Sequence, residues 1–232
     1  MIEQGFLDEI FVSYQGEGVF CGVRQVFVRF SLCNLKCAYC DTVAAGELKE
    51  KFNAFNGKKV KNPVTVAGVV KLLKSYRGKV HSVSLTGGEP LLQEAFVVRL
   101  AKALKKAGFR IYLETNGTLV NALKNILPYT DQVAMDIKLP STAKVKGLWK
   151  THAEFLKIAG KKAFVKIVVG EGFKISELKK ALRLTKNKIT VLQPCFGCNS
   201  AQLAERIEKT GIYNTVSEIR FVPQIHRLMG IK

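Results

Sequence analysis

Apolar and amphipathic segments alternate along most of the chain. Short runs rich in Val, Ile, Leu and Phe predict buried strands over residues 25–30, 81–85, 110–114, 132–136, 163–169 and 188–193. The amphipathic runs between them predict helices over residues 64–76, 91–107, 119–126, 152–159, 176–184 and 201–209. Strands that alternate with helices favour a parallel sheet with crossover helices. We therefore expect an α/β fold, an incomplete (β/α) barrel of about six parallel strands.

Residues that commonly begin or end helices stand near several of these boundaries. Ser176 and the pair Asn199 and Ser200 precede amphipathic runs, where their side chains can cap a helix. Gly108 and Gly211 follow such runs, at positions where a left-handed residue often ends a helix. We expect helices to begin and end at these residues.

Polar and chemically active residues follow the predicted strands directly. In parallel α/β sheets, functional sites lie beyond the carboxyl ends of the strands. We therefore expect one rim to be lined by five segments, at residues 33–40, 86–90, 115–118, 138–141 and 194–198.

The composition agrees with a globular protein. Hydrophobic residues make up 47% of the 232 residues, enough for a sizeable core, and no repeat or linker divides the chain. We expect one domain over residues 1–232. No apolar run reaches the ~18 residues that span a bilayer, and the acidic start lacks the basic region of a signal peptide. The expected compartment is the cytoplasm.

The charge is unusual, because 37 Lys and Arg face only 18 Asp and Glu, a net charge of +19. Such an excess can indicate nucleic-acid binding. The lysines, however, fall in short patches such as residues 58–61 and 105–106, without interleaved aromatic residues for base stacking. We therefore favour a solvated basic surface over a nucleic-acid groove.

Three cysteines stand in a C-x3-C-x2-C pattern, Cys33-Asn-Leu-Lys-Cys37-Ala-Tyr-Cys40. Three thiolates on one loop suit three corners of a [4Fe–4S] cluster, leaving the fourth iron open. A cofactor's amino and carboxylate groups can chelate that iron, as in the radical chemistry of S-adenosylmethionine (SAM). This spacing is identified as the signature of the radical SAM superfamily.

A zinc site is the alternative for these thiols. Structural zinc takes four protein ligands, so Cys195 or Cys198 would have to supply the fourth. These two form a C-x2-C of their own, which could be a redox pair or half of a metal site. The chain offers no matching second pair, so we favour a reduced, structural role for Cys195 and Cys198.

A second motif, Thr86-Gly87-Gly88-Glu89-Pro90, follows a predicted strand. It resembles the GGEP loop of the radical SAM superfamily, which binds the amino group of SAM. Two glycines let the backbone approach a ligand closely, and Glu89 is the only anion in the loop. By itself the segment could be an ordinary strand-to-helix turn with proline at the first helical position.

Further segments resemble the 7-carboxy-7-deazaguanine synthase family in order along nearly the whole chain. The first is Glu9-Ile-Phe-Val-Ser-Tyr14-Gln15-Gly16-Glu17-Gly18, whose QGEG part precedes the cysteines and is the most discriminating. The others are Phe27-Val-Arg29-Phe-Ser-Leu-Cys33, Cys40-Asp41-Thr42, Glu114-Thr115-Asn116-Gly117-Thr118, Leu192-Gln193-Pro194 and Pro223-Gln224-Ile225-His226-Arg227.

The resemblance implies a reaction. The family contracts the ring of 6-carboxy-5,6,7,8-tetrahydropterin to 7-carboxy-7-deazaguanine and releases ammonia, on the path to queuosine and related deazapurines. A 5′-deoxyadenosyl radical removes hydrogen from C6 and later returns it, so SAM is regenerated, and Mg²⁺ assists. The resemblance also implies a homodimer and an electron donor such as flavodoxin or ferredoxin.

The resemblance also assigns residues to the substrate and the metal. Tyr14, Gln15, Gly16, Arg29, Thr86 and His226 match positions that contact the pterin, and Thr42 matches the Mg²⁺ ligand. A buried Arg29 requires an anionic partner, either the substrate carboxylate or an internal acid. Taken alone, Thr42 could be a helix cap and His226 a solvent-exposed histidine.

The positions that match SAM contacts lie in or directly beside four of the rim segments, and Glu114 is a weaker candidate for the same rim. They are Tyr39, Cys40, Asp41, Gly88, Glu89, Asp136, Ile137, Lys138 and Gln193.

Three departures from the family pattern qualify this assignment. Asp136-Ile137-Lys138 stands where many members have Ser-Pro-Lys. Lys232 ends the sequence where a proline often lies near the substrate, which puts that contact in doubt. Cys195 and Cys198 belong to no family motif.

Two other functions compete with this interpretation. A glycyl-radical activating enzyme would share the cysteine triad and the GGEP loop, although the QGEG segment and the Gln-x-His tail favour the pterin enzyme. An RNA-binding or RNA-modifying protein would account for the charge of +19, and its affinity would fall steeply with salt.

Overall fold

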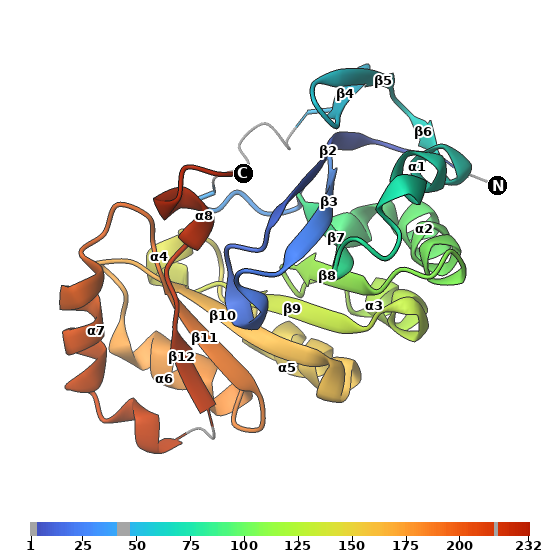
Figure 1. Ribbon diagram of the computed structural model, residues 1–232. Helices are drawn as coiled ribbons and strands as arrows, with labels where there is room; N and C mark the ends of the chain where they lie inside the picture. The colour runs from blue at the N-terminus through green and yellow to red at the C-terminus, as the bar shows by residue number, and fades with distance from the viewer. Residues whose placement is uncertain (1–3, 41–46, 216–217) are drawn as a thin grey trace.

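The computed structural model describes residues 4–40, 47–215 and 218–232. In this part of the chain, seven neighbouring strands of a ten-stranded sheet run parallel, starting from one edge of the sheet (Figure 1). In spatial order the seven are β3 (Arg24–Phe30), β7 (Ser82–Gly87), β8 (Ile111–Thr115), β9 (Gln132–Ile137), β10 (Ala163–Val169), β11 (Ile189–Pro194) and β12 (Glu218–Phe221). The first six match the predicted strands within two residues at either end, and β12 was not predicted.

The sheet continues beyond β3 with mixed strands. β2 (Leu7–Tyr14) pairs antiparallel with β3, β4 (Lys51–Ala54) pairs parallel with β2, and β5 (Lys58–Lys61) closes a hairpin with β4. A separate pair joins β1 (Gln4–Gly5) to β6 (Val64–Thr65). Because β12 and β5 end the sheet without pairing to each other among the described residues, the barrel stays incomplete.

The six predicted helices form on the outer side of the sheet (Figure 1). They are α1 (Val66–Leu73), α2 (Glu94–Lys106), α3 (Val120–Ile126), α5 (Trp149–Ala159), α6 (Ile175–Leu184) and α7 (Ser200–Glu208). The shorter pieces are α4 (Pro140–Ala143), α8 (Ile225–Leu228), η1 (Gly18–Phe20), η3 (Lys74–Tyr76), η4 (Pro90–Gln93), η5 (Leu127–Tyr129), η6 (Gly160–Lys162) and η7 (Ile212–Thr215).

The predictions of where helices begin and end are confirmed in part. The Asn199 side chain caps α7 by accepting from the Gln202 amide at 3.0 Å. Gly108 and Gly211 have φ angles of +87° and +64° after α2 and α7, as C-terminal caps require. The prediction for Ser176 was wrong, because α6 already begins at Ile175.

The hydrophobic core fills the layer between the strands and the outer helices, where Leu85, Leu113 and Ile167 are fully buried. Inside the barrel, η1 closes one end. Its Phe20 ring packs against Tyr112 at 5.7 Å and Phe164 at 6.3 Å, between ring centroids. The open end of the barrel is therefore the one at the carboxyl ends of the strands. None of the helices in the described ranges is long and apolar enough to cross a membrane.

Candidate active site

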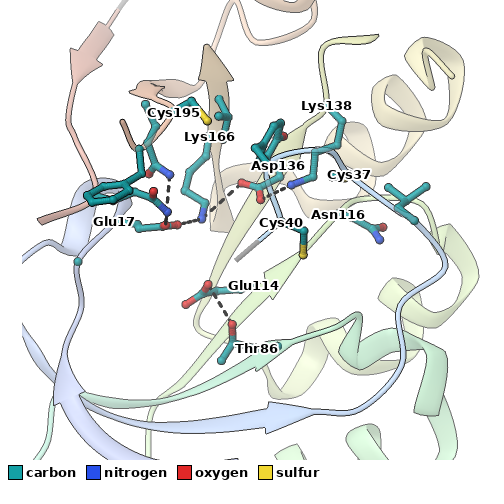
Figure 2. A pocket seen from close by; sticks show the side chains of 18 of the residues that line it. Glu17, Cys37, Cys40, Thr86, Glu114, Asn116, Asp136, Lys138, Lys166 and Cys195 are labelled. Carbon is teal, nitrogen blue, oxygen red and sulfur yellow. Dashed lines mark hydrogen bonds and ion pairs between the residues drawn. The ribbon is translucent and has the colours of Figure 1, made fainter. Parts of the chain in front are cut away.

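A cavity of about 1080 Å³ opens at the carboxyl ends of the parallel strands (Figure 2). The five segments that the sequence placed on one rim all contribute to its wall, which confirms that prediction. Among the described residues, seven Lys or Arg and three Asp or Glu line it. The cavity therefore suits ligands that carry negative charge.

The cysteine loop follows β3 and is held from neighbouring loops. The Ala38 amide donates to the Ala143 carbonyl at 2.9 Å. The Asn34 side chain donates to Thr118 at 2.8 Å and accepts from Asn116 at 2.8 Å. These bonds fix the loop against the loops that follow β8 and β9.

The thiols of this loop face the cavity. Cys33, Cys37 and Cys40 are free cysteines that line it. A [4Fe–4S] cube binds each thiolate at a different iron, so three cysteines on one loop supply the number of protein ligands that such a cluster takes when its fourth iron is open.

The glycines of the GGEP loop serve the cysteine loop as well as the cavity. A Cβ on Gly88 would lie 1.8 Å from the Leu32 carbonyl oxygen, directly before Cys33. The Gly88 amide donates to the Phe30 carbonyl at 3.0 Å, and the Glu89 amide donates to the Leu32 carbonyl at 2.8 Å. We expected this close approach toward a ligand, and the structure shows it toward the backbone before the cluster loop.

Glu89 lies under the cavity wall and does not line it. Its carboxylate is fully buried and accepts from the Asn116 amide at 2.7 Å, the Thr115 hydroxyl at 2.9 Å and the Leu91 amide at 3.1 Å. Burial raises the pKa of Glu89 to about 7, although these hydrogen bonds oppose that effect. This position departs from the expectation that Glu89 meets the amino group of SAM, because its oxygens are turned toward the loop after β8.

Four charged side chains form a line along one wall (Figure 2). The Lys166 ammonium contacts the Glu17 carboxylate and lies 3.5 Å from Asp136 Oδ1, while Lys138 donates to Asp136 Oδ2 at 2.9 Å. Burial alone would raise the pKa of Glu17, but the Lys166 charge and the Gln224 hydrogen bond outweigh it and lower the value to about 2. Burial opposes the charge on Lys166 as well, but Asp136 and Glu17 hold its pKa well above the usual range. The alternating charges therefore stabilise one another.

Glu17 also links segments that lie far apart in the sequence. Besides Lys166 of β10, its carboxylate accepts from Gln193 of β11 at 3.2 Å and from Gln224 of the C-terminal segment at 2.7 Å. One partly buried carboxylate thus links the loop after β2, two barrel strands and the segment before α8.

A second carboxylate, that of Glu114, faces the cavity from the end of β8. It accepts from Gln15 at 3.0 Å, Ser84 at 2.9 Å and Thr86 at 3.1 Å. The Gln15 carboxamide also bonds to Gln25 and to the Glu17 amide. Gln15 and Thr86 lie where the sequence placed them, and both orient Glu114.

The segment at residues 14–16 meets the C-terminal tail across the cavity mouth. Tyr14 is half exposed on the wall. A Cβ on Gly16 would lie 2.2 Å from Nδ1 of His226, so only glycine lets this imidazole pack here. The Ile225 amide donates to the Gly16 carbonyl at 2.9 Å. His226 is therefore held at the cavity and is not a free surface histidine.

Arg29 is partly exposed in the cavity, where we expected a buried guanidinium. Its Nε lies 3.9 Å from Glu9 Oε2, and the guanidinium lies 5.4 Å from the centroid of the Phe11 ring. The Lys232 ammonium contacts the same Glu9 and lies 5.5 Å from the same ring. Two cations thus share one acid, and the internal ion pair that the sequence left open does form.

The remaining candidates for SAM contact divide between the cavity and the core. Tyr39, Gly88, Asp136, Lys138 and Gln193 line the cavity. Ile137 is fully buried, so its side chain presents no surface there. Asp41 and Thr42 lie outside the described residues.

Several of these groups have free hydrogen-bonding capacity. Among the described residues, the buried Oε1 of Gln193, Oδ1 of Asp136 and the hydroxyl of Tyr39 have no hydrogen-bond partner. All three residues line the cavity. Buried polar atoms usually find partners, so these atoms fit a polar ligand.

Comparisons with known proteins agree along the chain. Residues 27–185 match the model of the radical SAM superfamily. The chain is 36% identical to the 7-carboxy-7-deazaguanine synthase of Geobacter sulfurreducens, covering 97% of this chain and 96% of that protein. It is 37% identical to the 7-carboxy-7-deazaguanine synthase of Archaeoglobus fulgidus, covering 97% and 98%.

The chain belongs to the 7-carboxy-7-deazaguanine synthase family of radical SAM proteins. The crystal structure of QueE from Escherichia coli superposes with a TM-score of 0.67 at 25% identity, covering 96% of this chain and 95% of that one. The fold of this 7-carboxy-7-deazaguanine synthase family member is therefore the incomplete barrel that the sequence predicted.

Lys166 is the main site residue that the sequence analysis missed in this family member. Its signal was present, because Ala163–Val169 is an apolar strand interrupted by one lysine, and a buried lysine requires charged partners. Glu17 stood inside the QGEG motif but received no role. The pairing of the two joins residues 149 positions apart, which local sequence pattern does not reveal.

Proposed function

We propose that this chain catalyses the ring contraction of 6-carboxy-5,6,7,8-tetrahydropterin to 7-carboxy-7-deazaguanine, with release of ammonia. The observation that carries the proposal is the composition of one cavity. The cysteine triad stands on one side, and a wall with two cations and a carboxylate stands on the other. The relatives that share the name 7-carboxy-7-deazaguanine synthase match nearly the whole chain.

The cysteine side would hold the cofactors. Cys33, Cys37 and Cys40 would ligate the [4Fe–4S] cluster, which together with bound SAM supplies the radical that abstracts hydrogen. Oε1 of Gln193, which has no hydrogen-bond partner, would accept from SAM, and so would Oδ1 of Asp136, whose neighbour at 3.5 Å is the Lys166 ammonium. The buried charges beneath them keep this wall rigid, because each ion is already paired.

The opposite wall would bind the pterin through complementary charge. Arg29 and Lys232 both face the cavity and share Glu9, so a substrate carboxylate can bind beside two cations. Glu114 presents an oriented carboxylate, which suits the adjacent N–H donors of an aminopyrimidinone ring. His226, held by Gly16, would contact the pterin edge.

Four further proposals extend this assignment. Thr42 would ligate a Mg²⁺ ion, which takes few protein ligands and several waters or substrate oxygens. A small electron carrier such as flavodoxin or ferredoxin would reduce the cluster. The chain would work in the cytoplasm as a homodimer.

The deciding experiment places deuterium at C6 of the pterin and uses anaerobically reconstituted protein. We expect 7-carboxy-7-deazaguanine by mass and deuterium in the recovered SAM, because the abstracted hydrogen returns through the cofactor. Normal product with no label in SAM would refute reversible abstraction. Formation of no product at all would refute the proposed substrate.

The comparisons favour neither rival function. The same assay tests the first rival, and a binding measurement tests the second. A glycyl-radical activating enzyme would cleave SAM slowly to 5′-deoxyadenosine and show no response to the pterin. An RNA-modifying protein would bind tRNA with an affinity that falls linearly on a log–log plot against salt.

A further inference from the structure

Two cysteines outside the triad stand together in the cavity wall. Cys195 and Cys198 flank a tight turn directly after β11, and both are free and partly exposed. Cys195 lines the cavity on the same wall as Lys166 (Figure 2). Neither thiol is needed by the proposed cluster, which takes the triad.

The turn brings the two thiols within bonding range. The Cys198 amide donates to the Cys195 carbonyl at 3.1 Å, and Gly197 has a φ of +87°, as the third residue of a type II turn requires. Such a turn holds its end Cα atoms less than about 7 Å apart, and disulfides form at Cα separations of about 4.4–6.8 Å. After burial, the Cys198 thiol is the next cause that raises the pKa of Cys195. Little backbone movement is therefore needed to join them.

We propose that Cys195 and Cys198 form a reversible dithiol–disulfide pair in the wall of the active-site cavity, oxidised by small-molecule disulfides. The thiolate of one cysteine attacks a sulfur of the small disulfide, forms a mixed disulfide and releases one small thiol. The second cysteine then displaces the other small thiol. The protein pair loses two electrons and two protons, and one small disulfide becomes two small thiols.

Cys195 and Cys198 are the cysteines best placed for this thiol–disulfide exchange. The sequence has six cysteines, and three of them form the triad that would be ligated by iron. Burial raises the pKa of the sixth, Cys21, to about 11, which keeps it a poor nucleophile. Burial also raises the pKa of the Cys195 thiol, so exchange is best measured at mildly alkaline pH.

The turn is coupled to the C-terminal segment. Phe196, between the two cysteines, is half exposed and lies 4.2 Å from the Arg227 guanidinium, measured to the ring centroid. Arg227 follows His226, and both line the cavity. Phe196 lies between the two cysteines, so we expect even the small shift that closes the disulfide to loosen its contact with Arg227. This consequence rests on the proposed function, since it concerns turnover in that cavity.

The test uses the full chain with its cluster, under anaerobic conditions, in mixtures of oxidised and reduced glutathione. Trypsin releases both cysteines in one peptide, residues 189–206, because no Lys or Arg lies between Lys188 and Arg206. We expect this peptide to lose two hydrogens and resist alkylation in oxidising mixtures, and to recover in reducing ones, while the visible absorbance of the cluster stays. Thiols that alkylate fully at every ratio, or that stop at the mixed disulfide, would overturn the proposal.

Cys198→Ser provides the matched control, because Cys198 does not line the cavity. Its Cys195 can only form the mixed disulfide. In wild type, oxidation should lower pterin turnover at limiting substrate by about two- to fivefold, the effect of an exposed cation–π contact, and dithiothreitol should restore it. Turnover that is unchanged by complete oxidation would overturn the coupling to the cavity. Since the mass measurement does not depend on turnover, an inactive enzyme would refute the proposed reaction and leave the disulfide pair tested.

Discussion

Replacing Glu17 by Gln tests how strongly the buried charges hold the cavity wall. The Glu17 carboxylate accepts from Lys166, Gln193 and Gln224, and its pKa falls from 4.5 to about 2 because Lys166 and Gln224 outweigh burial. Each unit of pKa difference between folded and unfolded chains is worth about 1.4 kcal/mol. The ionised carboxylate therefore stabilises the fold by about 3 kcal/mol.

Glu17→Gln keeps an oxygen for the two glutamines but removes the charge. Among the described residues, Lys166 then keeps Asp136, at 3.5 Å, as its ion-pair partner. Breaking a buried pair costs about 3–5 kcal/mol, and the remaining acid reduces that cost. We expect the free energy of unfolding to fall by about 2–3 kcal/mol, measured by urea denaturation of the anaerobic protein at pH 7.

The pH dependence has a defined sign. A lowered carboxyl pKa gives stability that is present above the unfolded value of 4.5 and is lost as pH falls toward about 2. The gap between wild type and variant should therefore stay nearly constant from pH 7 to pH 5. A gap that narrows across this range would contradict a lowered pKa.

Glu205→Gln is the matched control. Glu205 pairs with Lys209 at 2.6 Å on the surface of α7, where the two side chains are 64% and 73% exposed. Exposed pairs of this kind contribute about 0.3–0.5 kcal/mol. Equal small losses for Glu17→Gln and Glu205→Gln would refute the reasoning, since burial would then have made no difference.

Three further predictions concern ligands. Replacing Cys33, Cys37 or Cys40 singly by Ala should abolish the visible iron–sulfur absorbance and turnover. Cys198→Ala should leave both unchanged, and loss of the cluster in that variant would show that the ligands are assigned wrongly. Arg29→Ala should weaken pterin binding by ~1.5–3 kcal/mol, seen as a higher KM, without stopping slow SAM cleavage to 5′-deoxyadenosine. Thr42→Ala should raise the Mg²⁺ concentration needed for turnover without bleaching the cluster, and activity indifferent to chelation would remove Thr42 from the site.

The parallel strands were predictable because each is buried on both faces. Ala163–Val169 and Gln132–Ile137 are nearly continuous apolar runs, and such runs differ clearly from the amphipathic helices beside them. β12 was missed for the opposite reason. Glu218–Phe221 is an edge strand that is partly exposed along its length, so its apolar pattern is weak.

The sequence predicted which residues form the candidate site better than it predicted the contacts between them. Motifs placed Thr86 and Glu114 at strand ends, and strand ends meet at one rim in any parallel sheet. Gln15 follows β2, which runs antiparallel to β3, so only the family resemblance placed it in the site. The inward turn of Glu89 could not be foreseen, because it depends on donors from the loop after β8. The sharing of Glu9 between Arg29 and Lys232 likewise joins distant segments.

The two glycines of the GGEP loop show how one short segment helps to position the two sides of the cavity. A Cβ on Gly87 would lie 2.5 Å from Cγ of Arg29, and one on Gly88 would lie 1.8 Å from the Leu32 carbonyl oxygen. Gly87 thus packs under the proposed carboxylate-binding cation, and Gly88 under the residue that precedes Cys33. Because Arg29 and Cys33 are four residues apart on the end of β3 and its loop, the same strand carries the substrate side and the start of the cluster side. The two glycines let that strand end pack closely against β7, so the proposed pterin site and the proposed radical source are both positioned by the same pair of strands.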